Sequence, residues 1–307
     1  MRIVFMGTPE FAVPALQILL ENGYEIPAVV TAPDKPGGRL GMQQSAVKQF
    51  ALERGLKVLQ PEKLKDAAFL ESFRALQADL LVVVAFRMLP EVVWSLPPLG
   101  AVNLHGSLLP KYRGAAPINW AVIQGEKETG LTTFFLKKQI DTGDILFQES
   151  LPIGPDETAG ELHDRMMRLG AALILKTVRA IESGTAQAQP QTDALATLAP
   201  KIFPEDCQID FDRPVAQVHN FVRGLSPYPG AWTMLDGKIL KILRGRPLET
   251  GPTNTPPGQF SSDGKHWLRI RAADGLLEVL ELQLEGKRRM PVRDFLNGFK
   301  RDWEAEG

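Results

Sequence analysis

An amide and an imidazole stand two residues apart in the stretch VNLHGSLLPKYRGAAP, which covers residues 102–117. The apolar residues around Asn103 and His105 predict a short strand, and residues two apart on a strand face the same side. A glycine and a serine follow and end the strand. An amide donates hydrogens to an oxyanion, and an imidazole carries a proton near neutral pH. The pair therefore predicts a polar site at the end of a strand.

A second polar turn, with the sequence QIDTGD, lies between two strands predicted further along the chain. In open α/β sheets functional side chains gather beyond the carboxyl ends of the strands, so the two turns can meet. Asp141 would then keep the ring of His105 charged and oriented. An amide, an imidazole and a carboxylate without a serine or cysteine nucleophile argue against an acyl-enzyme. They favour direct attack of an amine on a carbonyl-like carbon, with an oxyanion to stabilise and a proton to move.

The elements around these turns predict an α/β fold. Apolar β-branched runs alternate with helical patterns, which is typical of a doubly wound, mostly parallel sheet. The run DLLVVVAF at 79–86 indicates a central strand that is covered on both faces. Thr8 is the expected N-cap of a first helix that begins at Pro9. Strands are expected at 2–6, 26–31, 57–59, 79–86, 102–105, 131–136 and 145–153, and helices from 9, at 46–54, 66–76 and 118–124, and from a cap at Asp156 or Thr158 to residue 184.

The pattern changes after residue 184. Residues 185–205 are polar, contain several alanines and prolines, and are weakly periodic, so they predict a linker. From residue 206 to 307 most apolar runs are short and β-like, separated by turns such as LDG at 235–237. These runs predict a small β-barrel with an OB-like architecture. The expected domains are therefore 1–184 and 206–307, joined by the linker 185–205.

Composition and charge argue against several classes of protein. The 307 residues are 44% hydrophobic with a net charge of −1, so no overall field draws the chain to nucleic acid or membrane. The turn GTPE at 7–10 lacks the G-x-G-x-x-G of dinucleotide sites, and the scattered histidines predict no metal site. No apolar window approaches the ~20 residues of a membrane span. The short apolar N-terminal run does not resemble a signal peptide, and the single Cys207 suggests a reducing compartment, so a cytoplasmic location is expected.

The motifs resemble those of the folate-dependent formyltransferases. The central match is Asn103-x-His105, followed by SLLP at 107–110 and by Asp141-Thr-Gly. Other stretches are similar to the branch of that family that acts on methionyl-tRNA. They are FMGTPEFAVP at 5–14, DKPGGR at 34–39, QPEK at 60–63, GKRRM at 286–290 and DFLNG at 294–298. The resemblance covers nearly the whole chain.

The resemblance implies a reaction and the roles of residues in it. 10-Formyltetrahydrofolate would donate the formyl group to the α-amine of methionyl initiator tRNA. Asn103 and protonated His105 would hold the oxyanion, while Asp141 would keep His105 charged and help to relay a proton through water. Domain 1–184 would bind the formyl-folate and domain 206–307 the tRNA, with no metal and no stable protein partner. The expected folate contacts are Phe86, Arg87, Met88, Leu89, Ser107, Leu108, Leu109, Pro110 and Asp141.

The expected contacts with tRNA are basic residues in two regions. The loop from Thr31 to Gln44 corresponds to one that the family inserts against the tRNA acceptor end, and Lys35 and Arg39 would contact phosphates or bases there. From residue 201 onward 16 Lys and Arg stand against 15 Asp and Glu, so this region is nearly neutral. Basic clusters occur within it all the same. The contacts expected from them are Lys238, Lys241, Arg244, Lys287 and Arg288.

The chain departs from the family pattern in three places. Arg87 follows Phe86 where many members have a glycine, which alters one wall of the expected folate site. The sequence KKQI precedes Asp141 where many relatives have a Met-rich run that ends in Gly-Leu. The loop after Arg39 is also poorer in lysine than in many members, so its contacts with the acceptor end can differ.

Two alternatives stay open at the level of sequence. A formyltransferase that acts on an amino-sugar nucleotide would share the Asn, His and Asp set and a similar second domain, but it would not need the GTPEF start or the DKP loop. A non-catalytic RNA-binding module on the same scaffold would not need that set intact. The domain predicted at 206–307 argues against a third, a glycinamide-ribonucleotide formyltransferase, because that enzyme would lack a C-terminal domain.

Overall fold

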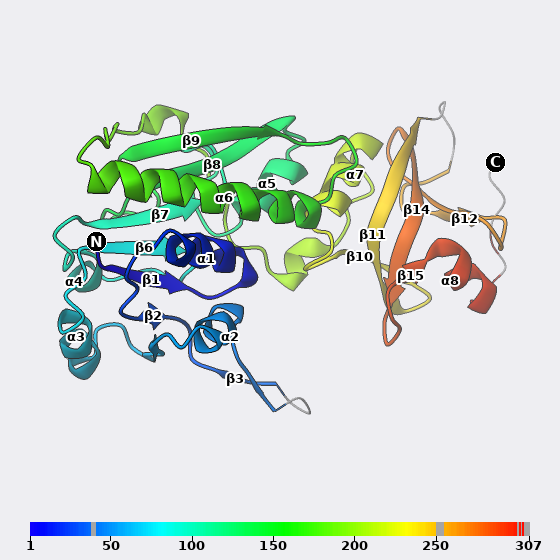
Figure 1. Ribbon diagram of the computed structural model, residues 1–307. Helices are drawn as coiled ribbons and strands as arrows, with labels where there is room; N and C mark the ends of the chain where they lie inside the picture. The colour runs from blue at the N-terminus through cyan, green and yellow to red at the C-terminus, as the bar shows by residue number, and fades with distance from the viewer. Residues whose placement is uncertain (38–40, 250–254, 300, 302, 304–307) are drawn as a thin grey trace. The chain divides into compact units, whose positions relative to one another are not determined.

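The computed structural model describes residues 1–37, 41–249, 255–299, 301 and 303, and the chain divides into two compact units (Figure 1). The first unit comprises 1–117, 130–151 and 163–199, and the second comprises 118–129, 152–162 and 200–307. Residues 185–199, expected to be linker, are thus part of the first unit. We keep 184 and 206 as proposed boundaries of the functional domains.

A seven-stranded sheet forms the centre of the first unit. Its strands, in spatial order, are β5 (Val58–Leu59), β2 (Val29–Val30), β1 (Ile3–Gly7), β6 (Leu80–Val84), β7 (Ala101–His105), β8 (Glu128–Phe135) and β9 (Ile145–Pro152). The pairs from β5 to β7 are parallel, and β8 pairs antiparallel with β7. The side chains of β1 and β6 are buried along their whole length, as expected for central parallel strands with helices on both faces. The doubly wound, mostly parallel sheet predicted from the sequence is confirmed.

Helices cover both faces of this sheet. They are α1 (Val13–Glu21), α2 (Ala46–Glu53), α3 (Ala67–Arg74), α4 (Glu91–Trp94) and α6 (Ala159–Glu182). In Figure 1, α1 and α6 lie on one face. Phe69 and Phe73 of α3 and Val93 of α4 belong to the hydrophobic cluster that Leu81 and Val83 of β6 form on the other face. A capping box begins α6, because Thr158 Oγ1 accepts from the Glu161 amide and the Glu161 carboxylate accepts from the Thr158 amide.

The start of the first helix differs from the prediction. A 3₁₀ turn, η1 (Glu10–Ala12), follows Pro9, and α1 begins only at Val13. Pro14 explains the shift. A proline has no amide hydrogen and its ring clashes with the carbonyl four residues earlier, so it fits the first turn of a helix and not its interior. A helix that began at Pro9 would have placed Pro14 in the interior.

A short hairpin between β2 and α2 projects from the first unit (Figure 1). Its strands are β3 (Lys35–Pro36) and β4 (Met42–Gln43), and they pair antiparallel. At its base, Asp34 binds Lys48 Nζ at 2.5 Å and Gln60 Nε2 at 2.8 Å. These hydrogen bonds, led by that of Lys48, lower the pKa of the Asp34 carboxyl. The residue that precedes the hairpin is therefore held to α2 by an ion pair and to Gln60 by a hydrogen bond.

The second unit contains an antiparallel sheet. Its strands run in the spatial order β10 (Ala231–Leu235), β11 (Lys238–Glu249), β14 (Gly275–Leu284), β13 (Leu268–Arg271) and β12 (Phe260–Ser262), and β15 (Met290–Pro291) pairs with β14. Helices α5 (Pro117–Ile123), α7 (Val215–Gly224) and α8 (Val292–Gly298) and the 3₁₀ turn η4 (Pro204–Cys207) accompany it. Register shifts between Ile242 and Gly245 bend β11 against β14. The sheet order ends at β10 and β12, so the predicted β-barrel is a half-barrel.

None of the helices in the part of the chain that the structure describes combines the length and the apolar character needed to cross a membrane.

Candidate active site

Strand β7 carries Asn103 and His105 on the face that also bears α3 and α4. Leu104, between them, points to the opposite face, where a Cβ at Gly170 of α6 would lie 2.7 Å from its Cδ2 atom. Asn103 pairs in register with Val83, a member of the cluster under α3 and α4. The alternation of a strand thus places the amide and the imidazole on one side, as the sequence predicts.

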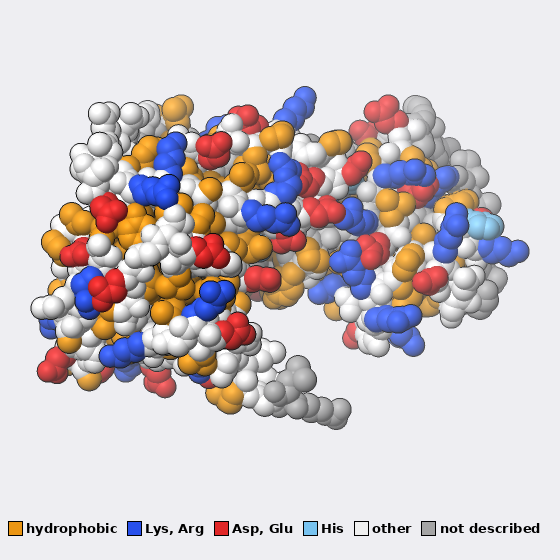
Figure 2. Space-filling model, viewed as in Figure 1, with side chains coloured by type: hydrophobic (Ala, Val, Ile, Leu, Met, Phe, Trp, Pro, Cys, Tyr) orange, Lys and Arg blue, Asp and Glu red, His pale blue; other side chains and the backbone are white. Residues whose placement is uncertain are grey.

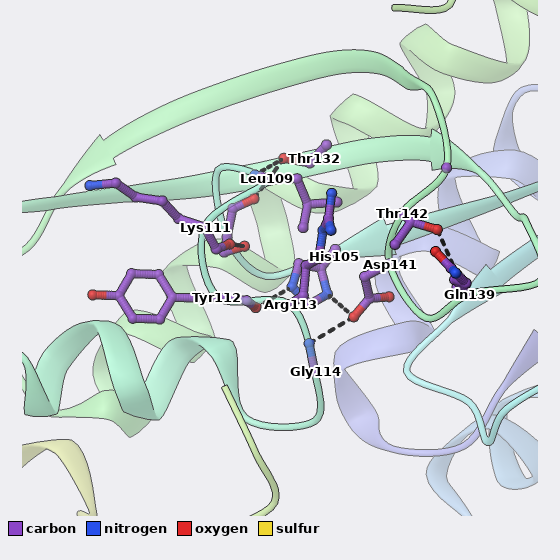
Figure 3. A network of polar contacts seen from close by, with 12 residues as sticks. His105, Leu109, Lys111, Tyr112, Arg113, Gly114, Thr132, Gln139, Asp141 and Thr142 are labelled. Carbon is purple, nitrogen blue, oxygen red and sulfur yellow. Dashed lines mark hydrogen bonds and ion pairs between the residues drawn. The ribbon is translucent and has the colours of Figure 1, made fainter. Parts of the chain in front are cut away.

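Both nitrogens of the His105 ring face oxygen atoms of the protein (Figure 3). Nε2 lies 2.8 Å from the carbonyl oxygen of Tyr112, and Nδ1 lies 3.7 Å from Oδ2 of Asp141. A carbonyl oxygen can only accept, so Nε2 must carry a hydrogen. The distance to Asp141 allows an ion pair but exceeds a hydrogen bond of normal length. The structure thus brings together the two residues that the sequence paired, with 7% of the His105 side chain and 14% of the Asp141 side chain exposed.

Two glycines allow the Asp141 carboxylate to reach this position. The amide of Gly114 donates to Asp141 Oδ2 at 2.8 Å. Gly114 has a φ of +130°, and a Cβ there would lie 2.5 Å from the carbonyl oxygen of Ala199. A Cβ at Gly143 would lie only 1.5 Å from the carbonyl oxygen of Phe135. A side chain at either position would displace the backbone that holds the carboxylate.

The turn that carries Asp141 does not start at the same end of the sheet as His105. Strand β8 is antiparallel to β7, and Phe135 at its end pairs with Val102, whereas His105 pairs with Thr132. The turn must therefore fold back along the face of the sheet to reach the ring. Asp141 itself adopts a left-handed conformation, with a φ of +54°, which is uncommon outside glycine.

The expected folate contacts lie in two loops that follow neighbouring strands. Strands β6 and β7 are parallel and adjacent, so residues 86–89 and 107–110 emerge at the same edge of the sheet. Met88 is 69% exposed, whereas Leu89 and Leu109 are buried. The guanidinium of Arg87 donates to the carbonyls of Pro61 and Glu62, which ties its loop to the segment 60–63.

The second of these loops is pinned by side chains that the sequence analysis missed. Thr132 Oγ1 donates to the carbonyl of Ser107 at 2.7 Å and accepts from the amide of Leu109 at 3.1 Å. Gln148 Nε2 donates to the carbonyl of Leu109 at 2.9 Å. The Ser107 hydroxyl donates to the carbonyl of Lys111. The sequence gives no signal for either residue, because Gln148 is an exposed polar residue of β9 and threonine is common in strands.

A segment of the expected linker also borders the site. The amide of Tyr112 donates to Thr197 Oγ1 at 2.8 Å. The amide of Arg113 donates to the carbonyl of Thr197, and the carbonyl of Arg113 accepts from the amide of Ala199. The residues that hold His105 and Asp141 therefore have a neighbouring strand-like segment that the sequence placed outside the catalytic domain.

The basic residues expected to contact tRNA fall into three groups. Lys35 is exposed in β3, and Arg39 lies outside the described residues. Lys241 donates to the carbonyl of Pro229, and Arg244 is bound to Glu161 and lies 3.9 Å from Glu281. Lys238, Lys287 and Arg288 are exposed.

The register of the second sheet brings the exposed group to one end. Leu240 pairs with Leu284, so Lys238 in β11 and the turn after β14, with Lys287 and Arg288, lie at the same end of the sheet. On the face shown in Figure 2, Lys and Arg side chains of this unit are interspersed with Asp and Glu side chains and do not form one continuous basic surface. In one such contact, hydrogen bonds from Arg289 lower the pKa of the Glu281 carboxyl.

Within the described ranges, no group of three or more His, Cys, Asp or Glu side chains is arranged to hold a metal ion. Cys207 is buried, and burial raises the pKa of its thiol. The polar side chains that the sequence singles out and that the structure brings towards the end of β7 are those of Asn103, His105 and Asp141.

This fold is that of the formyl transferases. Residues 1–178 match the family model described as formyl transferase, and residues 201–300 match the model of the formyl transferase C-terminal domain. The methionyl-tRNA formyltransferase of Parabacteroides distasonis is 54% identical to this chain, over 98% of the chain and 96% of that protein. That of Bacteroides fragilis is 51% identical, over 97% and 95%. The chain belongs to the methionyl-tRNA formyltransferase family.

Solved structures share the fold. An N-formyltransferase from Helicobacter canadensis, in complex with folinic acid and dTDP-3-aminofucose, has a TM-score of 0.69 at 20% identity, covering 94% of this chain and 99% of that chain. Methionyl-tRNA formyltransferase from Clostridium thermocellum has a TM-score of 0.57 at 20% identity, covering 80% and 93%. At these identities the likeness concerns the fold alone. The choice between methionyl-tRNA and an amino sugar as acceptor of the formyl group therefore rests on the relatives of about 50% identity.

Proposed function

We propose that this protein transfers the formyl group of 10-formyltetrahydrofolate to the α-amino group of methionyl initiator tRNA. The observation that carries the proposal is the His105–Asp141 pair beside Asn103, in a chain 54% identical to a methionyl-tRNA formyltransferase. The folate supplies an activated one-carbon group, and the side chains at the end of β7 supply charge stabilisation and proton transfer.

His105 donates a hydrogen to the oxyanion from Nδ1. Its Nε2 hydrogen is already bound by the Tyr112 carbonyl, so Nδ1 is the nitrogen that remains for the reaction. The Asp141 carboxylate lies 3.7 Å from this nitrogen and orients the ring. Its distance to Asp141 exceeds a normal hydrogen bond, so this N–H can also be shared with a substrate oxygen that lies near the ring plane.

Asn103 provides the second donor. Its side chain is partly exposed, and among the described residues no hydrogen bond engages its amide group. Its hydrogens are therefore available to an oxygen atom between it and His105. Preorganised donors of this kind stabilise a developing oxyanion without reorganisation.

Asp141 acts on the proton of the attacking amine. Its Oδ2 accepts from the Gly114 amide, which leaves the other carboxylate oxygen for a water molecule. Through that water Asp141 takes up the proton that the amine loses and passes it towards the leaving nitrogen.

The loops 86–89 and 107–110 would form the walls of the folate site. The exposed side chain of Met88 and the half-buried Phe86 and Leu108 offer apolar surface, and the loop backbone offers hydrogen-bonding groups, which together suit a flat pterin. We propose that Arg87 contributes through the position of its loop, because its guanidinium binds the carbonyls of Pro61 and Glu62.

For the tRNA, we propose that Lys35 and Arg39 act at the acceptor end. Lys238, Lys287 and Arg288, at one end of the second sheet, would bind phosphates. Lys241 and Arg244 would contribute less, since they already have partners within the protein.

A transfer assay with competing acceptors tests the proposal. Labelled 10-formyltetrahydrofolate is offered with charged initiator tRNA or with a dTDP-linked amino sugar. We expect the label on methionyl-tRNA alone. Formylation of the sugar would support the amino-sugar alternative, and tRNA binding without any transfer would support a non-catalytic RNA-binding module.

A further inference from the structure

Gln191, in the segment expected to be a linker, bonds directly to the turn that carries Asp141. Its Nε2 donates to the backbone carbonyl of Asp141 at 2.8 Å and to that of Gly143 at 2.8 Å. A side-chain amide has two hydrogens on its nitrogen, and here each has an acceptor. Gln191 thus holds the backbone on both sides of Thr142.

The other end of the same amide is held by Arg113. Gln191 Oε1 accepts from Arg113 Nε at 3.1 Å and from Nη2 at 2.7 Å. The guanidinium can only donate and the two carbonyls can only accept, so the amide has one satisfied orientation. Gln191 therefore links Arg113 to the turn 141–143 with a fixed polarity.

Arg113 stands between the two backbone groups that position the catalytic side chains (Figure 3). The carbonyl of Tyr112, just before it, faces His105 Nε2, and the amide of Gly114, just after it, donates to Asp141. Gln191 joins Arg113 to the backbone of Asp141 and Gly143. The contacts then form a closed ring, from Arg113 through Tyr112 to His105, on to Asp141, and back through Gln191 to Arg113.

The turn needs such a support. Asp141 has a left-handed backbone, and the turn starts at the end of β8 that lies away from His105. A residue in a sparsely populated conformation persists only when the surrounding structure determines it. The two hydrogen bonds from Gln191 act on the backbone at that position.

We propose that Gln191 is a positioning residue for the formyl transfer, because its amide sets the distance between the Asp141 carboxylate and the His105 ring. This inference rests on the proposed function for its kinetic consequence. It gives a role in catalysis to the segment 185–199, which carries no recognised motif. Asp193 also binds Arg113, but its side chain is 81% exposed and bonds to nothing in the turn 141–143 in the described structure.

Two substitutions separate the contacts of Gln191. Gln191→Ala removes all of them, and Gln191→Glu keeps a partner for Arg113 while it places a carboxylate against the two carbonyls. We expect kcat to fall about 10- to 100-fold in both variants, with the KM for the folate within about twofold of wild type, since misplaced catalytic groups affect the transition state. Gln189→Ala is the matched control, because this glutamine is exposed and pairs with Ile145 only through its backbone.

A double-mutant cycle with Asp141→Asn distinguishes positioning from general damage to the fold. If Gln191 acts through Asp141, Gln191→Ala should cost less than about twofold in the Asp141→Asn background. Multiplicative losses would overturn the proposal, and so would a wild-type kcat in both Gln191 variants. We also expect both Gln191 variants to unfold at the same temperature as the wild type while their kcat is reduced.

A measurement without activity separates this inference from the proposed function. Hydrogen exchange of the Gly114 amide reports its bond to Asp141, and we expect about 10-fold lower protection in Gln191→Ala than in Gln189→Ala. Retained protection of the Gly114 amide would overturn the positioning role, whichever substrate accepts the formyl group from the wild-type protein. Failure of the wild-type protein to formylate methionyl-tRNA would contradict the proposed function alone.

Discussion

The proposed catalytic residues of the first unit and the basic residues of the second unit are both polar groups singled out by type and spacing, but they are held in different ways. His105 and Asp141 are nearly buried, and backbone groups of the loop 112–114 bond to each of them. In the second unit Arg244 and Arg289 are bound to carboxylates, while Lys238 and Lys287 remain exposed.

This difference shows what a residue pattern specifies. An oxyanion site needs particular atoms at particular distances, so its side chains require supports that leave few alternatives. A phosphate-binding surface needs only positive potential, and a protein also uses arginines for its own ion pairs. A basic residue in the sequence is therefore weaker evidence of function than an amide and an imidazole two residues apart.

The largest expected effect is that of Asn103. Asn103→Asp keeps the volume but replaces the amide nitrogen by an oxygen, so the donors to the oxyanion are lost. We expect kcat to fall about 10²- to 10³-fold in this variant and in Asn103→Ala. Single-turnover transfer to methionyl-tRNA measures it, and a loss below tenfold would show that the amide is not a main donor.

Asp141→Asn should be nearly as damaging. The asparagine oxygen can still accept from the Gly114 amide, but the charge that faces His105 is removed. We expect kcat to fall about 10²-fold with folate binding retained. Asp144→Asn, in the same turn and paired with Lys137 at the surface, is the control and should stay within about twofold.

Replacing Lys238, Lys287 and Arg288 together by alanine should act on binding and not on chemistry. If each contacts one phosphate, the slope of log K against log salt falls by roughly 2 to 3, and affinity for tRNA falls about tenfold at low salt. kcat at saturating tRNA should hardly change. A salt dependence equal to that of the wild type would exclude this end of the sheet from the binding surface.

Arg244→Ala should have the smallest effect. Its guanidinium is bound to Glu161 and lies near Glu281, so little of its charge is available to a phosphate. We expect tRNA affinity within about twofold of wild type and a loss of about 0.5 kcal/mol in the free energy of unfolding, since exposed ion pairs contribute little. Titration at two salt concentrations and a denaturant melt measure both. A steep loss of affinity would remove the contrast between the paired and the exposed cations.

Much of the fold of the first unit was predictable, because its signals are local. Buried β-branched runs such as 79–86 and the cap at Thr158 act through the residues themselves and their near neighbours. The start of the first helix differs from the prediction because Pro14 fits only the first turn of a helix, which moves the start from Pro9 to Val13. The half-barrel could not be told from a closed barrel, because closure depends on which strands meet and not on their patterns.

The sequence by itself determined that Asn103 and His105 face one side, since the alternation of a strand places them there whatever surrounds them. Only the tertiary structure decided how Asp141 reaches them. Its strand runs antiparallel, so the turn begins at the far end and is brought back by Gly114, by Gly143 and by Gln191, which lies 50 residues further along the chain. Hydrogen bonds between segments so distant in sequence leave no local pattern, because each partner alone is an ordinary polar residue in a loop.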